Sequence, residues 1–124
     1  MRDPLIAELA QLRDRFEGAA LERQPNGTQV LEVPDMPLPS GWSLPHTAVW
    51  VVLPIGYPQV QPDCFYAAAD LALANGSIPA SSGIQQLLGS PKRWFSWHVQ
   101  SWDPLHDGLL QFVRFVERRL ADAR

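Results

Sequence analysis

The stretch from His46 to Pro62, HTAVWVVLPIGYPQVQP, constrains the fold more than any other part of the chain. Its first half is a run of β-branched and aromatic residues, which is typical of a strand in the interior of a sheet. Pro54 closes this run, and Pro58 and Pro62 follow it. Each proline fixes φ near about −65° and biases the preceding residue towards extended geometry. The sequence therefore predicts a central strand and then a rigid turn that leads the chain off the sheet.

Amphipathic helices are predicted at both ends of the chain. Asp3 and Asp103 are each followed by a proline, and a capping carboxylate before a proline is typical of a helix start. Gly18 is the predicted end of the first helix. Apolar residues recur at helical spacing after each start. They are Leu5, Ile6, Leu9, Leu12 and Phe16 in the first helix, and Leu105, Leu109, Phe112, Val113, Val116 and Leu120 in the second.

The middle of the chain is predicted to be strand and loop. Residues 24–33 indicate a turn that feeds a strand, and residues 64–66 a short strand. Residues 34–42 are predicted to be a proline-rich loop, and residues 74–94 a long loop with one helical turn at 84–88. The fold class is therefore α+β: an N-terminal helix, a small antiparallel β-meander, a long proline- and tryptophan-rich loop, and a C-terminal helix packed on the sheet.

Length, charge and cysteine content exclude several classes of protein. The 124 residues predict one domain spanning the chain, and a net charge of −3 gives no basic surface for nucleic acid. No apolar run approaches the roughly 18 residues of a membrane span, and the charged N-terminus is not typical of a secretion signal. A single cysteine excludes an internal disulfide and predicts a reducing, cytoplasmic location. Neither a metal-ligand spacing nor a cofactor motif is present, so we expect no metal and no cofactor.

Four motifs occur in an order that resembles a known family. The chain is similar to ubiquitin-conjugating enzymes, and in particular to the prokaryotic ubiquitin-conjugating-enzyme-like family E. The likeness runs from the N-terminus almost to the end of the second helix, and a fold of the UBC type is what it implies. The motifs are Gly56 to Tyr66 (GYPQVQPDCFY), Leu71 to Gly76, Phe95 to His98 (FSWH) and Trp102 to Pro104.

The resemblance also implies a framework and a set of partners. The partners are a ubiquitin-like protein, an adenylating activating enzyme and a JAB-type metalloprotease, with no nucleic acid and no membrane among them. The chain is thus predicted to act in a bacterial conjugation pathway as a carrier or acceptor of the ubiquitin-like protein. The residues expected to shape the turn and the loop are Tyr57, Pro58, Pro62, Trp97, Trp102 and Pro104.

One feature departs from the family pattern. Eukaryotic conjugating enzymes carry a loop cysteine that holds the acyl group as a thioester, and the corresponding position here, near Trp94, has no cysteine. The alternative prediction is therefore a catalytically inactive module, similar to RWD proteins. Such a module would dock a ubiquitin-like protein or its activating enzyme.

Cys64 and His98 are the candidate catalytic residues. Cys64 is the only thiol of the chain, and among aromatic residues and alanines a small buried hydrophobe is the alternative interpretation. A reactive thiol requires exposure and a positive neighbour. His98, in FSWH, could orient a carbonyl or move a proton, or it could simply bind loop backbone among the tryptophans. His46 and His106 are predicted to be structural or exposed to solvent.

Overall fold

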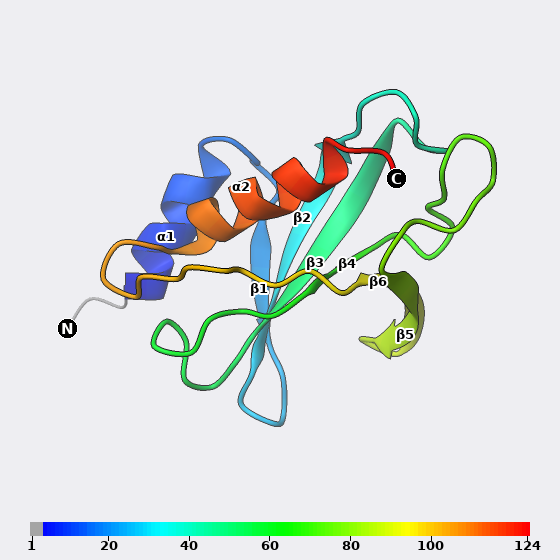
Figure 1. Ribbon diagram of the computed structural model, residues 1–124. Helices are drawn as coiled ribbons and strands as arrows, with labels where there is room; N and C mark the ends of the chain where they lie inside the picture. The colour runs from blue at the N-terminus through cyan, green and yellow to red at the C-terminus, as the bar shows by residue number, and fades with distance from the viewer. Residues whose placement is uncertain (1–3) are drawn as a thin grey trace.

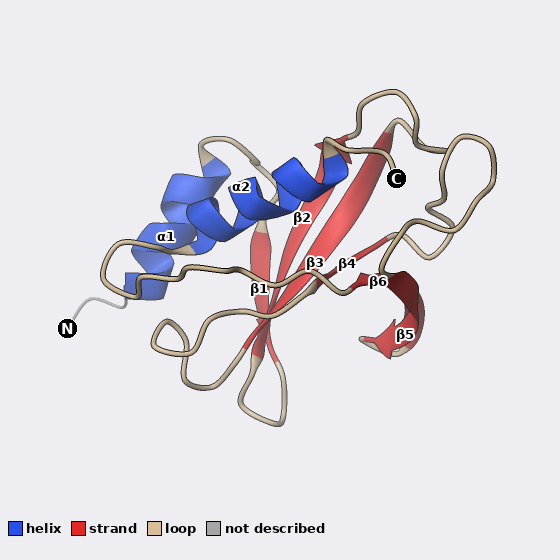
Figure 2. Ribbon diagram, viewed as in Figure 1, coloured by secondary structure: helices blue, strands red, loops and turns tan. Residues whose placement is uncertain are grey.

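The protein forms two layers, a six-stranded antiparallel sheet and a pair of helices that lie together on one side of it (Figures 1 and 2). The computed structural model describes residues 4–124. The strand order is β1-β2-β3-β4-β6-β5, so the α+β prediction is confirmed. The elements are α1 (Pro4–Arg13), β1 (Ala20–Arg23), β2 (Gln29–Pro37), β3 (His46–Leu53), β4 (Phe65–Ala67), β5 (Ser82–Leu87), β6 (Ser90–Phe95) and α2 (Leu109–Leu120).

Strand β3 lies inside the sheet, between β2 and β4, as its β-branched run predicted. Its side chains alternate in burial: Thr47, Val49 and Val51 are buried, and the residues between them are half-buried. The buried side faces the helices, because alternate residues of a strand point to opposite faces of the sheet. Strand β2 pairs with β3, and the register shifts between Val33 and Met36. The strand continues to Pro37, so the prediction of a loop at residues 34–42 was wrong in its first part.

Helix α2 closes the core with an apolar stripe. Phe112, Val113 and Val116 are at most 1% exposed, and the predicted periodicity holds from Leu109 onward. The stripe includes one cation, Arg119, which is 2% exposed and donates hydrogen bonds to the carbonyls of Ala80 and Asp122. Burial lowers the pKa of the Arg119 guanidinium. Its carbonyl partners compensate part of the lost hydration and tie the chain beyond α2 to the loop before β5.

The start of the second helix was predicted five residues too early. Asp103 and Pro104 lie in a separate turn, and α2 begins at Leu109 after Gly108. The Asp103 carboxylate accepts a hydrogen bond from the Leu105 N–H at 3.0 Å. This local bond offers the backbone an alternative to a helix, and it leaves Leu105 87% exposed, outside the apolar stripe. The Asp3 cap predicted for the first helix lies outside the described residues; that helix ends at Arg13, before Gly18.

The loop prediction for residues 74–94 was wrong in its second half. Residues 82–95 form a β-hairpin, β5 and β6, in place of the helical turn predicted at 84–88. Leu88 and Gly89 connect the strands, and both have positive φ, 54° and 78°. Two successive residues of positive φ suit the right-handed twist of a tight hairpin. Leu-Gly lacks the asparagine or aspartate that usually marks such a turn, so the signal for a hairpin at these residues is weak.

Candidate functional site

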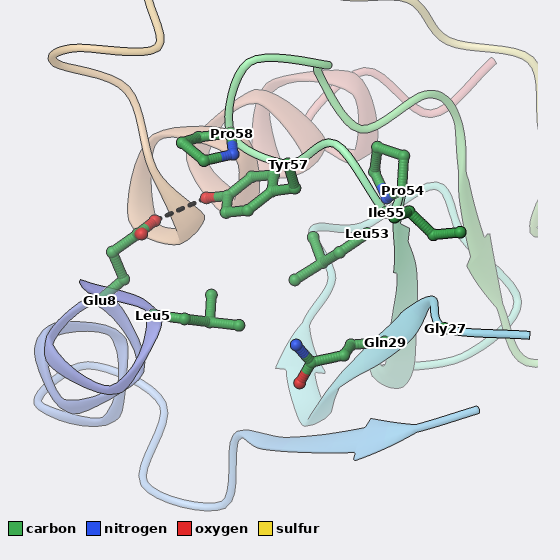
Figure 3. A pocket seen from close by; sticks show the side chains of 9 residues that line it. All are labelled: Leu5, Glu8, Gly27, Gln29, Leu53, Pro54, Ile55, Tyr57 and Pro58. Atoms are coloured by element: carbon green, nitrogen blue, oxygen red, sulfur yellow. Dashed lines mark hydrogen bonds between the residues drawn. The ribbon is translucent and has the colours of Figure 1, made fainter. Parts of the chain in front are cut away.

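The predicted turn lies where β3 leaves the sheet, and its tyrosine contacts Glu8 of α1 (Figure 3). The peptide between Tyr57 and Pro58 is cis. The Tyr57 hydroxyl donates a hydrogen bond of 2.5 Å to Oε1 of Glu8, on α1. The same oxygen accepts the N–H of Leu109, the first residue of α2, at 3.0 Å. Glu8 therefore caps α2 and anchors the turn at once, because an unpaired N–H at a helix start requires an acceptor.

A pocket of about 210 Å³ opens beside this contact (Figure 3). Burial, and next the hydrogen bond and charge of Glu8, raise the pKa of Tyr57 far above its usual value. The hydroxyl is thus protonated at all ordinary pH values and acts as a fixed donor. The residues that line the pocket are Leu5, Glu8, Gly27, Gln29, Leu53, Pro54, Ile55, Tyr57 and Pro58.

Beyond the turn, the chain runs beside the segment that follows β6. Three hydrogen bonds to backbone carbonyls join the two segments. Trp102 Nε1 donates to the Pro58 carbonyl at 2.8 Å, and Gln61 Nε2 donates to the Val99 carbonyl at 3.2 Å. The third bond runs from the Cys64 N–H to the Trp97 carbonyl, at 3.2 Å. This alignment brings the two candidate catalytic residues to the same place.

Asp63, Cys64 and His98 form one cluster at the end of these segments. One carboxylate oxygen, the thiol sulfur and one imidazole nitrogen all lie within 4.8 Å of one another. His98 Nδ1 contacts Asp63 Oδ1, and its Nε2 lies 3.3 Å from the Ser96 hydroxyl. The ring nitrogens thus contact side chains. The alternative prediction had them bound to the loop backbone.

The thiol occupies the inner position of the cluster. Cys64 is 5% exposed, and its φ of 66° lies in the left-handed region that few non-glycine residues adopt. Burial raises the pKa of the Cys64 thiol above its usual value, and the nearby Asp63 carboxylate adds to this rise. Hydrogen bonds from the Trp97 backbone and the Trp94 side chain act in the opposite direction. The balance favours the neutral thiol, which is the less nucleophilic form.

The other two members of the cluster lie at the surface. The side chains of His98 and Asp63 are 54% and 62% exposed. A ligand could therefore reach the imidazole and the carboxylate directly from solvent, whereas the buried sulfur is much less accessible. The arrangement places a proton acceptor, an anion and a soft sulfur donor together, which are the groups used by thiol chemistry and by metal coordination.

The remaining framework residues divide between the core and the surface. Trp97 packs against Phe115 with 5.9 Å between ring centroids, and Trp102 lies 6.1 Å from Tyr57 by the same measure. Pro62 is buried and Pro104 is exposed.

Two residues of these sites were not singled out from the sequence. Asp63 was interpreted only as a turn residue, although its place next to Cys64 was a usable signal. Glu8 carried no signal, because its partners are Tyr57 and Leu109, far along the chain. A polar residue on a helix is ordinary until the element packed against it is known.

The comparisons with known proteins give one match. Residues 12–123 match the family described as "Prokaryotic E2 family E". No curated protein and no solved structure matches the chain. Within residues 4–124, none of the helices has the length and apolar character that crossing a membrane requires.

Proposed function

Because the chain belongs to prokaryotic E2 family E, we propose that it serves a ubiquitin-like conjugation pathway as a binding module. In this proposal it docks a ubiquitin-like protein or the adenylating activating enzyme and forms no thioester itself. A JAB-type metalloprotease would act in the same pathway. The observation that carries the proposal is the state of Cys64, the only thiol of the chain.

A thioester carrier requires a thiolate that its partner can reach. Cys64 is 5% exposed, and burial raises its pKa. The loop position that holds the reactive cysteine in eukaryotic enzymes falls here near Trp94, which lies within β6 and pairs with Tyr66 of β4. Both features support a fold that is kept for recognition and not for acyl transfer.

The second candidate function is that of a carrier or acceptor, and one observation favours it. Cys64 lies beside an imidazole that a carboxylate holds in place, as in many thiol enzymes. In such a reaction Cys64 Sγ attacks the acyl carbon of the activated C-terminus, and its proton passes to His98. The bond between the acyl carbon and its activating group breaks, and that group leaves. For this step the thiol must become accessible when the partner binds.

One assay separates the two functions. The protein is mixed with the activating enzyme, ATP and the ubiquitin-like protein, and the products are separated with and without reductant. We expect no reducible adduct, together with measurable binding to at least one of the two proteins by calorimetry. We expect Cys64→Ser to bind equally well.

Other outcomes lead to different conclusions. A thiol-sensitive adduct that is lost in Cys64→Ser and retained in His106→Ala would establish the carrier function. A thiol-sensitive adduct that survives Cys64→Ser would contradict both candidates. Absence of binding to either pathway protein would count against a role in the pathway.

A further inference from the structure

We propose that Asp63, Cys64 and His98 form a binding site for a divalent cation of the zinc type. Their ligand atoms come from three different side chains and lie within 4.8 Å of one another. No metal-ligand spacing is visible in the sequence, because His98 is 35 residues from Asp63 and meets it only in the folded chain. The inference concerns the protein alone and does not depend on the proposed function.

The sheet holds the parts of the chain that carry the three donors. Phe65 follows Cys64 and pairs with Phe95 in the register between β4 and β6. Their rings stack with centroids 4.8 Å apart. The hydrogen bond from the Cys64 N–H to the Trp97 carbonyl joins the two segments just beyond the paired strands. The backbone on both sides of the cluster is therefore fixed by buried packing, as a preformed site requires.

The donor set matches the preference of zinc. Zinc binds thiolate, imidazole and carboxylate ligands, whereas magnesium and calcium take oxygen ligands alone. Zinc–ligand bonds are about 2.0–2.3 Å long, which places the donors of a tetrahedral site about 3.5 Å apart. The donors here lie within 4.8 Å of one another, and His98 Nδ1 contacts Asp63 Oδ1 directly, so on binding this pair would move apart and the longer separations would shorten. Three protein ligands leave the fourth position open for water or for a group from a partner.

Exposure gives the cation a route and the two outer ligands freedom to move. The side chains of His98 and Asp63 are 54% and 62% exposed, so rotation of either is not opposed by core packing. The sulfur of Cys64 lies beneath them and would form the inner bond. On binding, the thiol proton is released to solvent as the sulfur–metal bond forms, and no oxidation or reduction takes place.

The chain offers a matched control in a second pair of the same residue types. His106 Nδ1 contacts Asp103 Oδ2 at 2.5 Å in the turn before α2. The side chains of this pair are also exposed, 79% and 51%. No thiol accompanies them, since the only cysteine is Cys64. A cation that required only a surface histidine and a carboxylate would bind both pairs alike.

Titration with cobalt(II) tests the proposal on the whole protein. The protein is freed of metal with a chelator, kept reduced, and titrated with Co²⁺ while its absorption is recorded. We expect one equivalent to bind, with a sulfur-to-cobalt charge-transfer band and the visible bands of tetrahedral cobalt. Zn²⁺ should then displace the cobalt and abolish the charge-transfer band and the visible bands. Absence of the charge-transfer band would overturn the proposal.

Variants identify the ligands. Cys64→Ser should abolish the charge-transfer band, and His98→Gln and Asp63→Asn should each weaken binding at least about tenfold. His106→Gln and Asp103→Asn should bind as the unchanged protein does. Equal weakening by the control variants, or none by His98→Gln, would overturn the assignment.

A second measurement requires no substitution at the thiol. Zn²⁺ should protect Cys64 from alkylation in the unchanged protein by at least about tenfold, and an unchanged rate would contradict the proposal. None of these measurements contains a ubiquitin-like protein or an activating enzyme. Failure of the metal site therefore leaves the docking function intact, and failure of docking leaves the metal site intact.

Discussion

Within residues 4–124, two histidine–aspartate pairs differ in how they are built. Asp63 and His98 come from segments that meet only through the sheet, and they lie against a buried thiol. Asp103 and His106 are three residues apart in one exposed turn. The same two residue types thus serve a candidate functional site in one place and a local turn in the other. What separates the pairs is the third group and the scaffold around them, and not the pair itself.

The largest effect is expected from removing the packing that builds the first pair. Phe95→Ala should lower the free energy of unfolding by about 3–5 kcal/mol, because it deletes a ring that is 1% exposed and leaves a cavity. Phe95→Leu should cost less. Urea unfolding followed by tryptophan fluorescence measures both. At low urea, the pKa of His106 should be the same in Phe95→Ala as in the unchanged protein, because its pair forms within one turn. A change there would show that the two pairs are not independent.

A smaller effect is expected in the reactivity of the thiol that only the first pair has. In the presence of a metal chelator, iodoacetamide should alkylate Cys64 at least about tenfold more slowly in the native protein than in the urea-unfolded chain. Burial limits access, and the raised pKa lowers the thiolate fraction at neutral pH. Mass spectrometry of samples quenched over time gives the two rates. Equal rates would mean that the thiol is open, and the carrier function would then gain support.

The backbone beneath the first pair predicts an effect of about 1 kcal/mol. At a φ of 66°, a Cβ atom costs roughly 1–2 kcal/mol that glycine does not incur. Cys64→Gly should therefore be more stable than Cys64→Ala by about 1 kcal/mol in urea unfolding. His106→Ala, in the exposed turn, should change stability by less than either substitution at position 64. If alanine proved the more stable residue at position 64, the left-handed backbone would be refuted.

The smallest effect is expected at the second pair, where it appears as a shift in pKa. The hydrogen bond and then the charge of Asp103 raise the pKa of His106 above its usual 6.5. In turn, the hydrogen bond and the charge of His106 lower the pKa of Asp103 below its usual 3.8. The contribution of His106 to stability is complete below pH 6.5 and is lost as pH rises through its raised pKa. The contribution of Asp103 is complete above pH 3.8 and is lost as pH falls through its lowered pKa.

The interaction between His106 and Asp103 should therefore stabilise the protein most between pH 3.8 and pH 6.5. An NMR titration of the imidazole protons should show the raised pKa of His106, and Asp103→Asn should bring it back towards its usual value. Asp107→Asn is a suitable comparison, because the Asp107 charge is only the last of the contributions to the His106 pKa. A titration unaffected by Asp103→Asn would show that the contact does not persist in solution.

The elements that depend on local chemistry were predicted from the sequence. The β-branched run gave β3, and the prolines after it gave a turn at the exit of the sheet. The apolar stripe gave α2 from Leu109 onward. Each of these signals arises within a few residues, where steric limits and side-chain spacing act directly.

The wrong predictions have one physical cause. Two local structures compete for the same residues, and the sequence does not show which has the lower free energy. Asp103 followed by proline starts a helix or forms a turn of its own, and here the side-chain bond to Leu105 accompanies the turn. Residues 84–88 could form a helical turn, but their hydrogen-bond partners in β6 favoured a strand. Local propensity is weak enough for tertiary contacts to reverse it.

For the candidate site, the sequence determined which groups exist: one thiol, an aspartate beside it, and a histidine in FSWH. It also set the rigid turn that directs the chain towards them. Only the tertiary structure decided that Asp63, Cys64 and His98 meet, that the thiol is the inner member, and that Glu8 joins the turn to both helices. The reason is that proximity between distant residues is fixed by strand register and core packing, which minimise the free energy of the whole chain and are not encoded in any one segment.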